Sequence, residues 1–203
     1  RYQEVTGVQT CALPISSLSG AYYISTSDLG ATYLEVDGIF QIARQPEKVY
    51  GYEVALDTRL LENLTFGTSV SYVEGKLDAE DDGEYDTYMN GDRIPPLKVA
   101  SYLSYNMFKK LNMRLSHIYS GNRDKFDPRP NGTYVYGQGP VESFNLVSLT
   151  ANYNMSDSTL LSLGVQNLLN EDYYLPISQW DARPDNYIKG NGARLNLALK
   201  VNL

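Results

Sequence analysis

The sequence predicts an all-β protein, a transmembrane antiparallel β-barrel, on the basis of three observations. Apolar and polar residues alternate with a period of two along about eight segments, which is typical of strands with one apolar and one polar face. Most of these segments reach the ~9–11 residues that a tilted strand needs to cross a membrane, whereas strands of soluble proteins average ~5–6. The connections are alternately long and short, which is typical of outer-membrane barrels.

The first 15 residues do not follow this pattern. Residues 5–15 read VTGVQTCALPI and resemble the in-frame translation of a sequencing adapter. We therefore predict that residues 1–15 are a non-native, adapter-derived segment and that an upstream portion of the natural protein is missing. Cys11, the only cysteine, lies in this segment, so no disulfide or thiol chemistry is expected of the remaining chain.

The alternation is clearest at the C-terminus. There the aliphatic residues at 195, 197, 199, 201 and 203 are separated by Arg194, Asn196, Lys200 and Asn202 and by the small Ala198. Five further segments alternate in the same way, and two weaker ones complete the set. In chain order these predicted strands include residues 17–27 (weaker), 52–59, 64–72, 97–107 (weaker), 111–116, 147–153 and 159–167.

The predicted long connections are residues 28–46, 77–96, 121–143 and 169–191, and the short ones are 60–63, 108–110 and 155–158. Because outer-membrane barrels have short periplasmic turns and long outer loops, this order places the C-terminus on the periplasmic side. Tyrosines at strand ends fit the same arrangement, since the ring stays in an apolar layer while the hydroxyl reaches water. Those predicted to form such girdles are Tyr52, Tyr72, Tyr105, Tyr119 and Tyr153.

Composition excludes several classes of protein. The formal net charge of −7 argues against a nucleic-acid binder, which needs a basic surface. The sequence has no run of ~20 apolar residues that would form a membrane helix. With one histidine, His117, and one cysteine, the chain lacks the residues for most zinc and nucleophilic chemistry, so we expect neither an enzyme nor a cofactor.

Four short motifs resemble those of TonB-dependent outer-membrane receptors, in the same order and spacing. Residues 50–53 (YGYE) are similar to the family's GxE at a strand start, and residues 93–96 (RIPP) to its iPxxP motif. Residues 165–174 (VQNLLNEDYY) and 190–194 (GNGAR) resemble two motifs near the family's C-terminus, although Ala193 is an insertion and Leu203 replaces the usual terminal aromatic. The motif residues are Gly51, Glu53, Pro95, Asn167, Leu168, Tyr173, Gly190, Gly192, Arg194 and Leu203.

This resemblance implies more than the residues alone do. Such receptors have an N-terminal plug inside a barrel of about 22 strands, so residues 16–203 would be the C-terminal part of the barrel domain, holding about its last eight strands. The implied function is TonB-dependent active uptake of a scarce bulky solute, a ferric siderophore or another iron complex, across the bacterial outer membrane. The implied partners are the TonB–ExbB–ExbD system through the plug, outer-membrane lipid, the barrel-assembly machinery through the last strand, and the iron chelate.

Candidate ligand-binding residues lie in the predicted outer loops. Their cations and aromatic rings suit an anionic, aromatic ferric catecholate, although packing of each loop on its neighbour is the alternative. An acidic run at residues 78–86 suits Ca²⁺ by chemistry but not by spacing, so a solvated acidic loop is the other interpretation. The candidate ligand-binding residues are Arg123, Lys125, Phe126, Arg129, Tyr134, Tyr136, Trp180 and Arg183.

Two other functions remain open at this point. A passive channel or porin would have a similar wall but no energy coupling. A small structural or adhesion barrel of eight strands would have a filled interior. The run of small residues Gly67, Ser69 and Ser71 on a polar face favours a wider barrel than that.

Overall fold

We describe a computed structural model of the chain, which places residues 3–6, 11–12, 16–179 and 183–202. Its regular structure is almost entirely β, with one short α-helix and two 3₁₀ turns among the described residues. Among these residues no helix is long and apolar enough to cross a membrane. The elements are β1 (Gln3–Thr6), β2 (Cys11–Ala12), β3 (Ser16–Val36), β4 (Ile39–Leu61), β5 (Leu64–Leu77), β6 (Thr87–Tyr88), β7 (Lys98–Met107), η1 (Phe108–Lys110), β8 (Leu111–Ser120), β9 (Phe144–Ser156), β10 (Thr159–Gln166), α1 (Pro176–Gln179), η2 (Pro184–Asn186) and β11 (Arg194–Val201).

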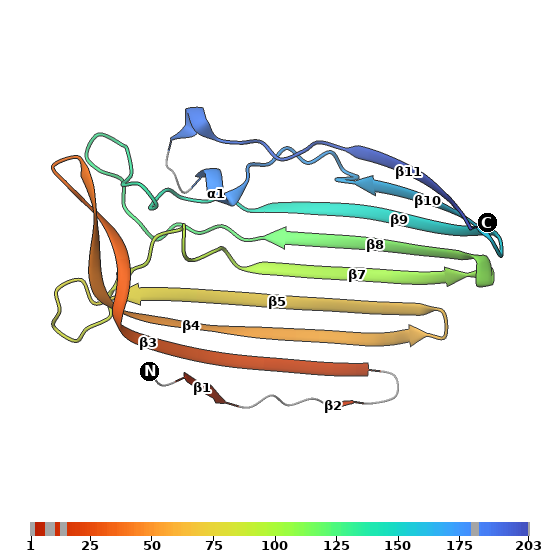
Figure 1. Ribbon diagram of the computed structural model, residues 1–203, viewed down its shortest axis with the longest axis horizontal. Helices are drawn as coiled ribbons and strands as arrows, with labels where there is room; N and C mark the ends of the chain where they lie inside the picture. Colours follow the sequence, from red (N-terminus) through yellow and green to blue (C-terminus); the bar gives the residue numbers. More distant parts are fainter. Residues whose placement is uncertain (1–2, 7–10, 13–15, 180–182, 203) are drawn as a thin grey trace.

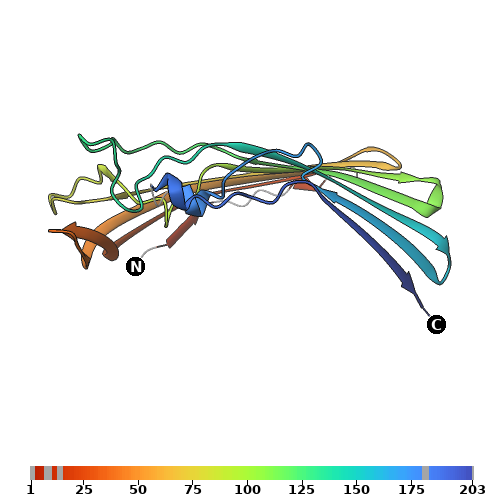
Figure 2. The same cartoon turned by 90° about the horizontal axis from the view of Figure 1, so that it is seen from above.

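All strands belong to one antiparallel sheet. Its order is β1-β3-β4-β5-β7-β8-β9-β10-β11, with β2 paired to β3 and β6 paired to β5. From β3 to β11, apart from the short β6, chain neighbours are therefore sheet neighbours, as in an up-and-down barrel wall. The sheet is a single twisted and curved layer, and it does not close within the residues described (Figures 1 and 2).

The predicted strands are confirmed, and so is the alternation of short and long connections for most of the chain. Short turns at 62–63, 108–110 and 157–158 lie at one end of the sheet, and long loops at 78–97, 121–143 and 167–193 lie at the other (Figure 1). A wall built from successive hairpins gives this separation when every second connection is lengthened.

The predicted loop at residues 28–46 is wrong. β3 continues to Val36, β4 begins at Ile39, and only Asp37 and Gly38 form the turn. Both turn residues have positive φ, 52° and 77°, as a two-residue hairpin turn requires, and an Asp-Gly pair is a strong signal for it. The sheet therefore extends into a long hairpin beyond the wall, bent at the irregularity between Ser27 and Gly30 (Figure 1).

The register places apolar residues together on one face of the wall. One row crosses six strands without a polar residue, and these positions pair directly with their neighbours. The row consists of Phe66, Leu103, Leu115, Leu149, Val165 and Leu195. Leu103, Leu115 and Leu195 are exposed in this single layer, as expected of side chains that meet lipid. We refer to this side as the outward face and to the opposite side as the polar face.

Tyrosines lie at both ends of the outward face. Tyr22, Tyr52 and Tyr72 form a row across β3, β4 and β5 near the loops, and the rings of Tyr52 and Tyr72 stack 5.4 Å apart. Tyr105 and Tyr153 lie near the short turns. Along a single strand, the rows of Tyr72 and Tyr153 are ten residues apart, about 33 Å, or about 25 Å across a membrane at a tilt of ~40°. The strands are therefore long enough to span the apolar band of an outer-membrane barrel.

The segments at the N-terminus, β1 and β2, pair along the outer edge of β3. An exposed edge presents free N–H and C=O groups to which any extended segment can pair. This pairing does not bear on the origin of residues 1–15, so the prediction of an adapter-derived segment stays a prediction.

Candidate functional site

The long loops are joined to one another at one end of the sheet. The Gly91 amide donates to the Gly137 carbonyl over 2.7 Å, and Gln138 Nε2 donates to Asn90 Oδ1 over 3.3 Å, which links loops 78–97 and 121–143. The tip of the β3–β4 hairpin also reaches this cluster, because the ring of Phe40 meets Tyr136 edge-on at 5.6 Å. Three connections thus form one loop cluster.

Loop 78–97 folds onto the polar face near the end of β5. Met89 and Ile94 are 1% and 3% exposed, and they pack with Leu77 against the partly buried Val49 and Val73. Gly75 makes this possible, since a Cβ there would overlap Met89 and Ile94. This cluster is the compact hydrophobic core of the described chain, and it fixes the loop over the interior side of the wall.

An ion pair joins the same loop to β4. Arg93 Nη1 lies 2.7 Å from Glu47 Oε2 and also donates to the Ala31 carbonyl over 3.0 Å. Arg93 begins the RIPP segment, and Ile94 beside it is buried. The RIPP motif therefore has a structural role: it positions loop 78–97 against the β3–β4 hairpin.

A buried ion pair lies between β5 and loop 121–143. Glu74 is 2% exposed and Arg123 is 8% exposed, with Arg123 Nη2 3.0 Å from Glu74 Oε1. The same Nη2 donates to the Met89 carbonyl over 2.7 Å, and the guanidinium lies 5.4 Å from the centre of the Phe126 ring. A charge this deeply buried needs a partner, so the ion pair fixes loop 121–143 to β5. The bond from Arg123 to the Met89 carbonyl fixes the same loop to loop 78–97.

Three side chains form a network on the polar face, midway along the wall. The Tyr102 hydroxyl donates to Asp57 Oδ1 over 2.5 Å, and the Arg114 guanidinium lies 3.7 Å from the centre of the Tyr102 ring. Gly67 lies between Asp57 and Tyr102 in the register, and a Cβ there would overlap the ring. The glycine lets the tyrosine lie flat across β5, and the network fixes a cation on the interior surface.

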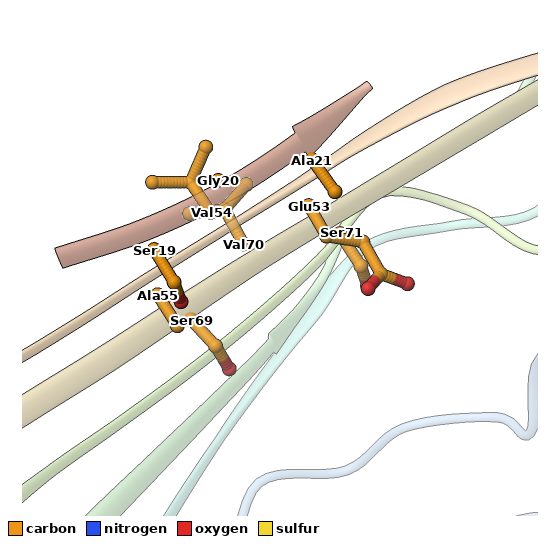
Figure 3. Close-up of a pocket in the computed structure, with 9 residues that line it drawn as sticks. All are labelled: Ser19, Gly20, Ala21, Glu53, Val54, Ala55, Ser69, Val70 and Ser71. Atoms are coloured by element: carbon orange, nitrogen blue, oxygen red, sulfur yellow. The ribbon is translucent and has the colours of Figure 1, made fainter. Parts of the chain in front are cut away.

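A shallow hollow of about 410 Å³ lies on β3, β4 and β5 (Figure 3). Val54 and Val70 point to the outward side, whereas Ser69, Ser71 and Glu53 point to the polar side. The hollow exists because small side chains leave the main chain uncovered there. It is lined by Ser19, Gly20, Ala21, Glu53, Val54, Ala55, Ser69, Val70 and Ser71.

The predicted ligand-binding residues lie in three different environments. Arg123 is buried in its ion pair and Phe126 is half-buried beside it, so both contribute to loop packing. Lys125 is exposed, with its Nζ 5.0 Å from the centre of the Tyr88 ring. The third group lies in the outer loops. In loop 121–143, Tyr134 is half-buried, and Arg129 and Tyr136 are exposed. In loop 167–193, Arg183 is exposed. Trp180 lies outside the described residues.

The acidic run at 78–86 has a defined turn at its start. Asp78 is 3% exposed, and its carboxylate accepts hydrogen bonds from the amides of Asp82 (3.1 Å) and Gly83 (2.8 Å). The carboxylate is thus occupied by main-chain donors of its own loop. Across the described part of the chain, no three potential metal ligands are grouped.

Asn167 organises loop 167–193, which follows β10. Its Nδ2 donates to the carbonyls of Glu171 (2.9 Å) and Asn191 (3.0 Å), and its Oδ1 accepts from the Glu171 amide at 2.8 Å. Asn170 Oδ1 accepts a further bond from the Ala193 amide over 2.9 Å. Both asparagines have positive φ, which this residue tolerates. The motif residue thus closes the loop by joining its two ends.

Aromatic packing and an exposed ion pair complete this loop. Tyr173 packs on Phe144 with ring centres 4.6 Å apart, and it covers Gly190 so closely that a Cβ there would overlap the ring. Lys189 Nζ lies 2.7 Å from Asp172 Oδ2, and this hydrogen bond, with the carboxylate's charge, raises the pKa of Lys189. Of the remaining C-terminal motif positions, Leu168, Gly192 and Arg194 are exposed, and Leu203 lies outside the described residues.

We expect Asn167→Asp to loosen loop 167–193, because the carboxylate keeps the acceptor but loses both donors. Leaving the carbonyls of Glu171 and Asn191 without these bonds should cost about 1–3 kcal/mol of loop stability. The measurement is the rate of proteolytic cleavage within residues 167–193 of the folded receptor. Asn186→Asp, at an exposed position in the same loop, is the matched control and should leave the rate unchanged. Equal rates for both variants would contradict the role given to Asn167.

Sequence reasoning missed the Asp57–Tyr102–Arg114 network and the Glu74–Arg123 pair. Alternation placed Asp57 and Arg114 on polar faces of their strands, but only the register shows that Tyr102 lies between them. The sequence does not indicate that Glu74 is buried in an ion pair, because its position is simply the next one on the outward face of β5 beyond Tyr72. His117, on the outward face, bonds to Asn145 at 2.9 Å, as a wall residue does.

Comparisons with known proteins agree on the fold. A family model described as TonB dependent receptor-like, beta-barrel, matches residues 16–168. Among solved structures, the copper transporter OprC superimposes with a TM-score of 0.76 at 17% identity, over 96% of this chain and 30% of that one. The FrpB iron transporter from Neisseria meningitidis gives 0.69 at 16% identity, over 95% and 29% of the two chains.

A third similar structure is the ferric-catecholate import receptor Fiu from K12 E. coli. Its TM-score is 0.66 at 15% identity, over 92% of this chain and 25% of that one. The chain therefore spans between a quarter and a third of the length of these three proteins. Identities this low show a shared fold, and this chain matches only part of each of these larger proteins.

Proposed function

The chain belongs to the TonB-dependent receptor β-barrel family, and from this premise we propose that it forms wall and outer loops of a receptor that imports a scarce bulky solute. The family's proteins lie in the bacterial outer membrane, and so does this chain. Energy would come from the TonB–ExbB–ExbD system acting through a plug domain. The last strand would be the part presented to the barrel-assembly machinery.

The proposed domain organisation assigns residues 16–203 to the C-terminal part of the barrel domain and leaves residues 1–15 outside it. The family match beginning at residue 16 supports this division. An open edge at β11 also supports it, because lipid offers no partners for unpaired main-chain groups and the wall needs further strands to close.

We propose a ferric siderophore of the catecholate type, or a similar anionic iron complex, as the solute. The observation that carries this proposal is the loop cluster, where exposed Arg129 and Tyr136 and half-buried Tyr134 lie at the loop end of the wall. Arginine and tyrosine together bind anionic aromatic rings through charge, stacking and hydrogen bonds. Arg183 in loop 167–193 adds a further exposed cation.

The interior surface offers a path for such a ligand below the loops. On the polar face, Arg114 is held over the Tyr102 ring while Asp57 bonds the hydroxyl, so a fixed cation faces the lumen. Small serines and alanines around the hollow of Figure 3 leave room beside it. An anion released from the loop cluster would meet this cation on its way through the barrel.

The test measures uptake of ferric enterobactin, as the catecholate probe, by cells whose only catecholate receptor is the full-length protein. Replacing Arg129 and Tyr136 together with alanine is expected to reduce ligand affinity at least fivefold, and uptake at low ligand concentration with it, since such contacts contribute about 0.5–2 kcal/mol each. The double variant Lys109→Ala/Lys110→Ala, which removes cations from the short turn at the opposite end, is the control and should bind normally. Equal binding by both variants would refute the loop-cluster site.

The same cells separate active uptake from a passive channel. Uptake should stop when TonB is removed, because a plugged barrel does not conduct a bulky solute by itself. Persistent uptake without TonB would favour a porin-like protein. Uptake of copper in place of the ferric catecholate would keep the transport proposal and replace its ligand.

A further inference from the structure

Lysines replace apolar residues at the loop end of the outward face. Above the row of Tyr22, Tyr52 and Tyr72, the second row along the strands contains Thr26, Lys48, Lys76 and Tyr88, which are direct cross-strand neighbours on β3, β4, β5 and β6. The alternation of β4 and β5 is unbroken between these rows. Lys48 and Lys76 therefore project from the same face as the lipid-facing residues below them.

A third lysine joins this row from loop 121–143. Lys125 Nζ lies 5.0 Å from the centre of the Tyr88 ring, and Lys76 Nζ lies at the same distance from that ring. Two ammonium groups thus share one aromatic ring, which attracts both cations and holds them near each other. We refer to Lys48, Lys76, Lys125 and Tyr88 as the lysine patch.

The lysines of the patch have no carboxylate at ion-pair distance. Within the described ranges, no ion pair involves any of the three. Glu74, one row below on the same face, is already paired with Arg123. Three cations are thus gathered without an ion-pair partner in a chain of net charge −7.

The main chain of the lysine patch lies just beyond the lipid headgroups, and its ammonium groups can reach them. Lys76 is four residues beyond Tyr72, about 13 Å along the strand, or about 10 Å above the tyrosine row at a tilt of ~40°. The polar layer of a membrane extends ~5–8 Å beyond its hydrocarbon core. Long lysine side chains can bend toward that layer, so their ammonium groups reach it.

We propose that the lysine patch binds the phosphate groups of an anionic lipid in the outer surface of the membrane, on the side of the long loops. Ammonium groups pair with phosphate, and the position on the outward face restricts the occupant to a molecule that lies in the bilayer. The bound lipid would also hold loop 121–143, through Lys125, against the ends of β5 and β6.

The test titrates the detergent-purified full-length receptor with bisphosphorylated lipid A in mixed micelles and measures the bound lipid by native mass spectrometry. The triple variant Lys48→Gln/Lys76→Gln/Lys125→Gln is expected to bind about 100-fold more weakly, at about fivefold for each lysine. Each single substitution should weaken binding about fivefold, which keeps the test decisive if the triple variant does not fold.

The matched control removes the same charge elsewhere. Lys98 lies on the polar face, and Lys109 and Lys110 lie at the opposite end of the wall, so the corresponding triple glutamine variant should bind lipid A normally. A charge-retaining Lys76→Arg variant should also bind normally. Uptake of the ferric catecholate should not change in the double variant Lys48→Gln/Lys76→Gln, because these two lysines lie on strands and face away from the lumen.

Three results would overturn the proposal. One is equal binding by the lysine-patch and control variants. Another is equal binding of lipid A whose phosphates have been removed, which would show that the acyl chains alone determine the affinity. The third is displacement of lipid A by inorganic phosphate at low millimolar concentration, which would identify a site for free phosphate instead of lipid.

Discussion

Replacing Arg123 with alanine is expected to destabilise the loop cluster by about 3–5 kcal/mol, which is the usual cost of removing one partner from a buried ion pair. Glu74 would be left 2% exposed with its carboxylate uncompensated, and the Met89 carbonyl would lose its donor. Since Met89 and Ile94 pack on β5 beside this pair, loops 78–97 and 121–143 should both loosen. Urea unfolding of the detergent-folded receptor, with proteolysis of the two loops, measures the effect.

Two further variants distinguish this loss from a general loss of charge. Lys189→Ala removes a cation from an ion pair of similar geometry that is exposed, and only a small change is expected. The double variant Glu74→Leu/Arg123→Met should recover most of the stability, because apolar residues of similar volume often replace a buried pair without penalty. An Arg123→Ala receptor that unfolds and is cleaved like the wild type would contradict the role of the pair.

The strands of the wall could be predicted from the sequence because their alternation depends only on residues that are close together in the chain. A period of two follows from the strand alone, and the last strand shows it from Arg194 onward with the small Ala198 as its only departure. Loop lengths then separate the two ends of the sheet. The loop predicted at residues 28–46 is wrong because Asp37 and Gly38 form a two-residue hairpin turn. An Asp-Gly pair is a strong local signal for such a turn.

The candidate site was less predictable because it depends on contacts between distant residues. Arg123 looks like a ligand-binding cation in the sequence, yet its carboxylate partner is 49 residues earlier, on a strand whose register the sequence does not state. Lys125, two positions later, lies over Tyr88 on the outward face. Alternation assigns a side chain to a face, but only strand register decides which residues meet across it.

The second large effect is expected at Gly51, in the YGYE motif. Gly51→Ala should destabilise the wall by about 1–3 kcal/mol or more, because the added Cβ would overlap the main-chain oxygen of Tyr72 and the Tyr23 hydroxyl. The main-chain oxygen belongs to β5, so it can move only if the β4–β5 pairing is distorted. The urea concentration at half-unfolding and the yield of folded receptor in the outer membrane are the measurements.

Gly20→Ala is the matched control for this substitution, since it adds the same methyl group in the neighbouring strand β3. A Cβ at Gly20 would meet its nearest atom, the Glu53 carbonyl oxygen, at 3.7 Å, which is an ordinary contact. Because alanine also restricts the unfolded chain, Gly20→Ala should stabilise by about 0.4–1 kcal/mol. The two substitutions thus have opposite expected signs. If Gly51→Ala also raised stability, close approach between strands would not explain the glycine, and a role for the motif in assembly would have to replace it.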